Sequence, residues 1–299
     1  EHKRGIHAGY AKFETFPIWN LPLKHPVNLA YEAATADLND VNMIDPFHLE
    51  AYGETTVNYN RDVEIFPVLN TIFEKIYGES PYKSPTDMGV NMAGNCICDD
   101  EACREASKQE IIRRYYAALN ALAKGETSDK EAHKIELLMN MAGITVADRK
   151  VAVEALKRAK ETGGPAAALE LDDGRIITGK TTNLLGASAA LLLNVLKVLA
   201  GIEHERHIIS PQSIEPIQKL KVDYLKSKNP RLHTDEVLIA LSASAADSTE
   251  ARLALSQLPK LNGCQAHTSV MLSDVDIKIF KKLGVQLTCE AVYEHIFLS

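Results

Sequence analysis

AAALELDDGRIITGKTTNLLGASAALLLNVLKVLA, residues 166–200, is the stretch that decides the fold class of this chain. Two short strand-like runs, 166–171 and 175–178, flank Asp172-Asp173-Gly174, a turn sequence that favours a two-stranded β-hairpin. An apolar helix is expected directly after the hairpin, over residues 182–199. A hairpin followed by an apolar helix predicts a small α/β layer domain.

The apolar run 184–200 is too short and too polar to be a membrane span. It is interrupted by Asn194 and Lys197, whereas a spanning helix needs about 20 mostly apolar residues. We therefore expect a helix that is buried within the protein. The rest of the C-terminal half alternates helical and strand-like patterns, with helices expected at 213–226, 234–244, 247–258 and 273–283, and strands at 267–272 and 285–288.

The N-terminal half predicts a different arrangement. A strand is expected at 10–19, followed by helices at 28–38 and 62–77, and then by a helical segment at 99–122, 128–141 and 145–160. Thr162-Gly-Gly-Pro165 is the best candidate boundary. The predicted fold is thus α/β, with three parts: 1–98, an α/β part of a nucleotide-binding domain; 99–161, a helical segment; and 166–299, a small α/β domain.

Composition narrows the class of protein. The 299 residues carry a net charge of −7 and no block of Lys and Arg, which argues against a nucleic-acid partner. The first residues lack the apolar segment of a signal peptide. Five cysteines, an odd number, fit reduced thiols in the cytoplasm. We expect a cytoplasmic protein without a membrane anchor, and the absence of an initial Met suggests a C-terminal portion of something longer.

The polar stretch NMIDPFHLEAYGETTVNYNRD, residues 42–62, is the main candidate for chemistry. It is expected to be a loop, and loops carry many binding residues. His48, Glu50 and Asp62 would supply acid–base groups, while Arg61 would bind an anion. The alternative is a surface loop whose polar groups satisfy one another.

A second candidate is the Gly- and Asn-rich turn before the helix at 99–122, where Asn91 and Asn95 would help to form an anion-binding turn. The nearby Cys96, Cys98 and Cys103 have a spacing that does not fit a zinc site, so no metal is predicted. The leading hypothesis is a site for a small anionic, phosphate-containing or nucleotide ligand, lined by His48, Glu50, Asn58, Arg61, Asp62, Asn91 and Asn95.

Three weaker patterns favour structural explanations. Gly174–Thr181 formally matches the phosphate-loop spacing G-x4-G-K-[ST], but its intervening residues are expected to form a strand that cannot wrap a phosphate. His204 and His207 follow a helix end and are expected on the surface. Ser188 would be a nucleophile only if Lys226 or Lys228 served as its base.

Several passages resemble one bacterial family, the one catalogued as domain of unknown function 1846. They are the run from YAKFETFPIW (10–19) to NYNRDVEIFPVL (58–69), then SPTDMGVNMAGN (84–95), KQEIIRRYY (108–116) and ALELDDGRIITGKTTNLLGASAA (168–190). The resemblance implies a longer protein with a glycine-rich, APGPGSGK-like stretch upstream. It supplies no catalytic residues.

A further resemblance concerns element order. The C-terminal half is similar in order to cytidine-deaminase-like domains, yet Ser188-Ala189-Ala190 stands where those carry a zinc ligand and a Glu, and their P-C-x-x-C motif is absent. A deaminase-like fold without deaminase chemistry is the expectation.

Three functions follow as hypotheses. The first is the binding of a phosphate-containing or nucleotide ligand. The second is a non-catalytic assembly protein, a homo-oligomer built through the apolar helix 184–200. The third is a Ser–Lys ATP-dependent peptidase acting through Ser188, a label that some relatives carry. The sequence identifies no reaction and no cofactor.

Overall fold

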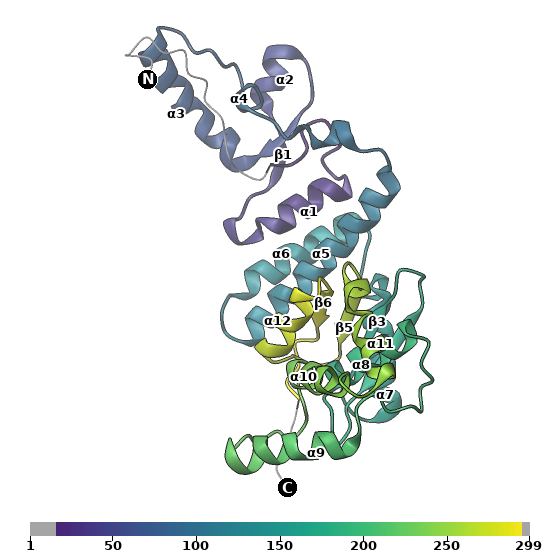
Figure 1. The fold of residues 1–299 in the computed structure, drawn as a ribbon. Helices are drawn as coiled ribbons and strands as arrows, with labels where there is room; N and C mark the ends of the chain where they lie inside the picture. The colour runs from purple at the N-terminus through teal and green to yellow at the C-terminus, as the bar shows by residue number, and fades with distance from the viewer. Residues whose placement is uncertain (1–15, 295–299) are drawn as a thin grey trace. The chain divides into compact units, whose positions relative to one another are not determined.

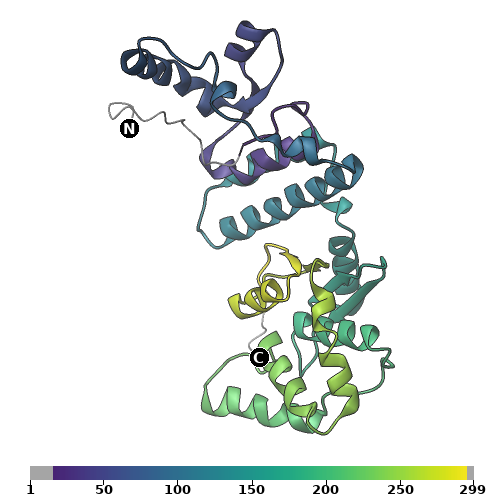
Figure 2. The ribbon, with the colours of Figure 1, turned by 45° about the horizontal axis from the view of Figure 1, so that its top comes forward.

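The computed structural model of the chain describes residues 16–294 and confirms a mixed α/β fold (Figures 1 and 2). The chain forms two compact units. Unit 1 comprises the residues up to Tyr115 together with Thr127–Thr145; unit 2 comprises Tyr116–Glu126 and the residues from Val146 onward. The long helix α5 (Asp100–Ala123) contributes residues to both units. The observed units divide near residue 145, inside the helical segment predicted at 99–161.

Unit 1 combines helices with a two-stranded sheet. The strands β1 (Asn42–Ile44) and β2 (Val57–Tyr59) are antiparallel, with Met43 opposite Asn58. The other elements are α1 (Pro26–Ala34), η2 (Ala36–Leu38), α2 (Pro46–Tyr52), α3 (Asn60–Tyr77), α4 (Pro85–Met88), η3 (Met92–Cys96), the first part of α5, and α6 (Asp129–Ala142). The helices predicted at 28–38, 62–77, 99–122 and 128–141 are confirmed, with shifted ends.

The prediction of a loop over residues 42–62 is wrong, because this stretch contains β1, α2, β2 and the start of α3. Asp45 caps α2 by accepting hydrogen bonds from the backbone N–H groups of Phe47 and His48, and Pro46 occupies the first helical position. Gly53, at φ 71°, ends the helix in the left-handed conformation that glycine favours. A seven-residue helix between three-residue strands is too short to show a clear period.

Of the strand predicted at 10–19, residues 10–15 lie outside the described part. The remainder forms a single parallel bridge between Ile18 and Asn91.

Unit 2 is built on a four-stranded sheet in the order β4-β3-β5-β6. The predicted hairpin is confirmed: β3 (Ala166–Glu170) is antiparallel to β4 (Ile176–Lys180), and Leu171 N donates to Arg175 O at 2.9 Å across the turn. On its other side β3 is antiparallel to β5 (Gln265–Thr268), which is parallel to β6 (Gln286–Cys289). The strand β4 is therefore an edge of the sheet.

Helices cover both faces of this sheet. The helix α7 (Lys150–Thr162) packs on the face that carries Ala168, and α8 (Ala187–Leu199) packs on the face that carries Ala167 and Leu169. Successive residues of a strand point to opposite faces, so β3 is buried on both sides. The remaining elements are η4 (Val146–Asp148), α9 (Pro211–Lys219), a π-helical turn η5 (Leu220–Tyr224), α10 (Thr234–Ser244), α11 (Thr249–Leu255), η6 (Leu258–Leu261) and α12 (Asp274–Lys282).

The helix α8 is buried within unit 2, as its composition predicts. Leu191, Leu192, Val195 and Leu196 are each fully inaccessible. This burial leaves α8 no apolar face for a second copy of the chain, so the assembly hypothesis loses the interface on which it was based. Among residues 16–294, no helix combines the length and apolar character needed to cross a membrane.

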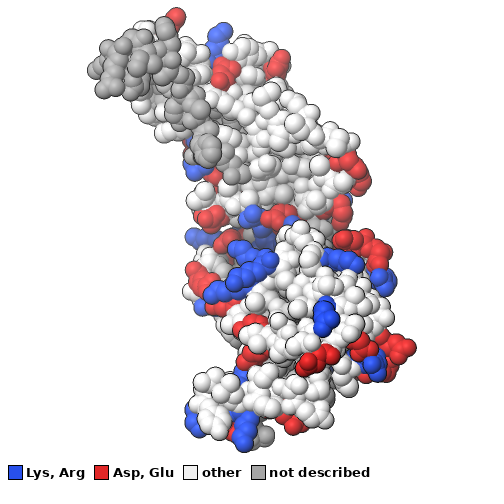
Figure 3. Space-filling model, in the orientation of Figure 1, with Lys and Arg blue, Asp and Glu red and all other residues white. Residues whose placement is uncertain are grey.

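Arg149 joins the ends of the two parallel strands. Its buried guanidinium donates to Thr288 Oγ1 at 2.8 Å, to Gln265 Oε1 at 2.8 Å, and to the carbonyl oxygens of Ala266 and Gln286. These bonds satisfy backbone acceptors at the β5–β6 pair, where an unpaired carbonyl would cost free energy. Charged side chains of both signs lie beside one another on the face of unit 2 drawn in Figure 3.

Candidate functional site

The predicted site residues of the polar stretch lie in unit 1, and most of them have partners within it. His48 is buried, and its Nδ1 lies 2.9 Å from Ser84 Oγ. The neighbouring Asp45 accepts bonds from Thr86 N at 3.1 Å and Thr86 Oγ1 at 2.5 Å. These bonds join α2 to α4. Several polar side chains of the stretch therefore hold two short helices together.

The residues at the end of the stretch also interact within unit 1 or are buried in it. Asn58 is buried in β2, where its Oδ1 accepts a bond from Tyr59 N. Arg61 Nη2 lies 3.3 Å from Oδ2 of the buried Asp40. Asp62 is buried in the first turn of α3, a position where the helix dipole favours a carboxylate.

Asn91 and Asn95 both bond to the segment 16–20. Asn91 Nδ2 donates to Phe16 O at 3.0 Å, and Asn95 Oδ1 accepts from Asn20 Nδ2 at 3.2 Å. The polar stretch meets the same segment, because Val57 N donates to Trp19 O. The two predicted segments thus approach each other through a shared neighbour and its hydrogen bonds.

Glu50 is the remaining predicted residue. It is exposed on α2 and lines a surface pocket of about 680 Å³, between α2 and α3, that also includes Lys83. A ligand role for the seven residues stays a prediction.

A larger cavity, of about 740 Å³, lies in unit 2 beside the edge strand β4. Its lining combines an apolar part with a basic one. The apolar part is formed by Leu184, Leu185, Ala190, Leu193, Ile208, Ile209 and Ile214, and the basic part by Arg158, Lys180, Lys197, His204, Arg206 and His207. Among the described residues that line it, none is Asp or Glu.

The cations around this cavity differ in how they are paired. Arg206 Nη2 lies 2.8 Å from Glu250 Oε1, and this hydrogen bond raises the pKa of Arg206. Arg158 Nη1 lies 3.4 Å from Glu161 Oε2. Lys180, in contrast, is exposed at the end of β4 and has no ion pair within residues 16–294.

Lys197 is a buried cation in the wall of the cavity. Its ammonium donates to the carbonyl oxygen of His204, and burial lowers its pKa while Glu205 acts in the opposite direction. The bond joins α8 to the segment 204–209, so Lys197 helps to hold that segment over the cavity. His204 and His207 both lie on this segment, and both are exposed.

The glycine at position 179, which completes the phosphate-loop spacing, has a packing role instead. A Cβ atom at this position would lie 2.2 Å from the backbone nitrogen of Leu191 in α8. Glycine is therefore needed for the close approach of strand and helix. The expected strand is confirmed as β4, whose backbone is paired with β3.

Two sequence patterns for which a structural explanation was favoured, the G-K-T run and the histidine pair, thus lie at one cavity. Lys180, Thr182 and Asn183 come from the G-K-T-T-N run, and His204 and His207 from the segment after α8. No spacing rule connects residues 20 positions apart across a helix, and the sequence reasoning missed the site for that reason. The one sequence feature that connects the two runs is that they flank the same apolar helix.

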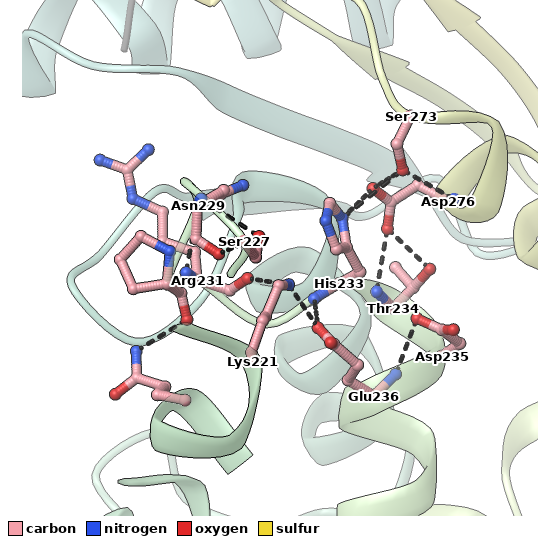
Figure 4. Close-up of polar contacts among 12 residues, drawn as sticks. Lys221, Ser227, Asn229, Arg231, His233, Thr234, Asp235, Glu236, Ser273 and Asp276 are labelled. Atoms are coloured by element: carbon pink, nitrogen blue, oxygen red, sulfur yellow. Dashed lines mark hydrogen bonds and ion pairs between the residues drawn. The ribbon is translucent and has the colours of Figure 1, made fainter. Parts of the chain in front are cut away.

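Outside the cavity, unit 2 holds a buried carboxylate with several partners (Figure 4). Asp276 Oδ2 lies 2.9 Å from His233 Nδ1 and accepts from Ser273 Oγ at 2.8 Å, while its Oδ1 accepts from Thr234 N and Oγ1. Ser273 and Asp276 both approach the same ring nitrogen of His233. A Ser–His–Asp triad needs them on opposite nitrogens, so the cluster is a structural tie between α10 and α12.

The peptidase hypothesis finds no support in the geometry. Ser188 is 3% exposed within α8, and Lys226 Nζ donates to Asp223 O at 2.6 Å. A buried hydroxyl is not accessible to a peptide bond. In the described part of the chain, no three His, Cys, Asp or Glu side chains are grouped so that they would hold a metal ion.

Comparison with known proteins assigns both parts of the chain. Residues 1–143 match the family described as "Domain of unknown function DUF1846, N-terminal", and residues 147–298 match its C-terminal counterpart. A UPF0371 protein of Corynebacterium urealyticum is 62% identical over 98% of this chain, and one of Corynebacterium efficiens is 61% identical over 98%. A UPF0371 protein of Streptococcus thermophilus is 58% identical over 97%.

The chain spans 59% of the length of each of these relatives. The boundary between the two matches, at residues 143–147, includes the point after Thr145 where the chain passes from unit 1 to unit 2, although Tyr116–Glu126 of unit 2 lie within the first match. The resemblance drawn from the sequence is thereby confirmed: this chain belongs to the DUF1846 family of bacterial proteins, which has no established function.

Proposed function

We propose that the protein binds a small phosphate-containing anion, and that the site is the unit 2 cavity beside β4. The chemistry of the ligand is the one expected from the sequence, but the location is new. The observation that supports the proposal is the lining itself: cationic and imidazole side chains over an apolar floor, without a carboxylate among the described lining residues.

The size and the polarity of the cavity support this ligand class. Sites for small molecules typically have volumes of about 300–1,000 Å³ and combine apolar walls with a few polar groups, and this cavity has about 740 Å³. The ammonium of Lys180 and the guanidinium of Arg206 would donate charge-assisted hydrogen bonds to phosphate oxygens. The leucine and isoleucine side chains would cover the organic part of the ligand.

Isothermal titration calorimetry tests the proposal with a defined panel: inorganic phosphate, AMP, ATP and, as the uncharged comparison, adenosine. We expect phosphorylated compounds to bind and adenosine to bind at least tenfold more weakly, because the phosphate provides the charge-assisted bonds. Lys180→Gln removes an exposed cation that has no ion pair within residues 16–294, and should weaken binding about tenfold, the effect of one such bond. Lys260→Gln, an exposed lysine outside the cavity, is the matched control.

Two outcomes would overturn the proposal. One is the absence of heat with every phosphorylated compound. The other is binding that Lys180→Gln and Lys260→Gln leave equally unchanged, because the ligand would then occupy another place. If Arg61→Ala abolished binding instead, the unit 1 residues predicted from the sequence would be the site.

A further inference from the structure

The helix α3 carries an apolar stripe that unit 1 does not cover. Ile65, Val68, Ile72 and Ile76 are 45%, 55%, 45% and 50% exposed. Their spacing of three or four residues places them on one side of the helix. The side chains that anchor α3 in unit 1 are others, Val63 and Phe66.

Such a row of half-exposed aliphatic side chains is unusual on the solvent-facing surface of a folded protein. The apolar pattern over 62–77 predicts a helix with a packing face, yet half of each of these aliphatic side chains remains in contact with water. Contiguous exposed apolar patches mark interaction surfaces. The free energy gained by covering four such side chains, at about 25 cal/mol per Å², favours an apolar partner of matching shape.

The charges beside the stripe indicate which partner fits. Glu64 and Lys75 lie on the same edge of the stripe, because positions 11 residues apart almost coincide around the axis of an α-helix. Glu64 stands near the start of α3 and Lys75 near its end. Neither side chain has an ion pair among residues 16–294.

A second copy of α3, placed antiparallel, satisfies both charges at once. If the two stripes are centred on each other, Ile65 of one copy faces Ile76 of the other, and Leu69 faces Ile72. In that alignment Glu64 and the partner's Lys75 are about 3 Å apart along the helix axis, at 1.5 Å per residue. The two-fold axis generates the pair twice.

We propose that the α3 stripe is a homodimer interface in which two copies of α3 pack antiparallel, with Glu64 of each copy opposite Lys75 of the other. A single helix pair is small compared with the ~800 Å² per partner of a standard interface. The dimer should therefore dissociate at micromolar concentration.

Sedimentation velocity over a series of concentrations tests the interface in the purified protein. The wild type should shift from monomer to dimer as the concentration rises, and Ile72→Glu should remain monomeric, because it places a carboxylate in the centre of the stripe. Since Ile72 is exposed, this variant should keep the wild-type circular dichroism spectrum. Ile239→Glu, an exposed isoleucine on α10 in unit 2, is the control and should dimerise normally.

A charge exchange tests the antiparallel arrangement separately. Glu64→Lys and Lys75→Glu should each weaken the dimer about tenfold, and the double variant should restore it, because each pair then recovers opposite charges. A wild type that stays monomeric at every concentration would overturn the proposal. So would a dimer that Ile72→Glu does not weaken, or a double variant no tighter than the single ones.

Discussion

At the scale of single residues, Asp276 links stability to pH. Burial alone would raise its pKa, but the hydrogen bonds from His233, Thr234 and Ser273 lower it to about 2, against an ordinary value of 3.8. The same interaction raises the pKa of His233, although burial opposes the shift. Both shifts describe one ion pair, which is intact only when the carboxylate is ionised and the imidazole is protonated.

The sign of each effect follows from linkage. A lowered carboxyl pKa stabilises the folded state above pH 3.8, and this contribution of roughly 2 kcal/mol disappears as the pH falls from about 4 to about 2. A raised imidazole pKa stabilises the folded state below pH 6.5, and its contribution is lost as the pH rises through the folded pKa.

Urea denaturation at a series of pH values measures this dependence. We expect Asp276→Asn to lose roughly 2 kcal/mol of unfolding free energy near pH 5 and to flatten the acidic and the alkaline slopes. Asp247→Asn, at an exposed carboxylate of unit 2 outside this cluster, serves as the control and should keep both slopes. The account is contradicted if Asp276→Asn has the same pH profile as the wild type.

The residues of the site were only partly predictable. Density of polar residues singles out 42–62, but Asp45, His48 and Asn58 are bonded inside unit 1. Composition cannot distinguish polar groups that bind a ligand from polar groups that cap a helix. Lys180 and His207 belong to separate sequence patterns, because they come together only through the packing of β4 and α8.

At the scale of elements, the contact between β4 and α8 depends on Gly179. Alanine at this position would place its Cβ 2.2 Å from Leu191 N and 2.5 Å from Leu191 Cα, both backbone atoms that cannot move aside alone. We expect Gly179→Ala to destabilise unit 2 by about 3 kcal/mol, as overpacking does. Gly164→Ala is the matched control, because nothing lies within 4 Å of its added Cβ.

Thermal unfolding followed by circular dichroism compares the two alanine variants. Equal melting temperatures for Gly179→Ala and Gly164→Ala would show that the strand and the helix are not held together as described. A stable Gly179→Ala variant that has lost phosphate binding would instead favour the phosphate-loop explanation of the G-K-T run.

The elements that the sequence predicted best are those with long or strongly patterned runs. The hairpin at 166–180 and the apolar helix that became α8 are both present, because Asp172-Asp173-Gly174 specifies the turn and a mostly apolar helix requires burial on all sides. The sequence did not predict the short elements β1, α2 and β2. They are specified by a cap, Asp45, and by bonds to α4 that are distant in sequence.

At the scale of the whole molecule, unit 2 includes residues that precede the C-terminal family match. Tyr116 OH donates to Glu290 Oε1 at 3.1 Å, its ring packs on His267 at 4.8 Å, and Asn120 Nδ2 donates to Cys289 O at 2.7 Å. These contacts cover the end of β6 with the last turns of α5.

Fragments of the chain test this division. We expect fragment 147–299 to be about 3 kcal/mol less stable than fragment 116–299, from two lost hydrogen bonds and one uncovered aromatic ring. Urea denaturation gives both values. Equal unfolding free energies would show that the last turns of α5 contribute nothing to unit 2.

The claim that a phosphate-like anion occupies the unit 2 cavity is tested most directly by crystals soaked in tungstate, a phosphate surrogate with a strong anomalous signal. The account predicts an anomalous peak within hydrogen-bonding distance of Lys180 Nζ and the Arg206 guanidinium, and its loss in Lys180→Gln crystals. A cavity without a peak, while tungstate binds elsewhere on the protein, would contradict it.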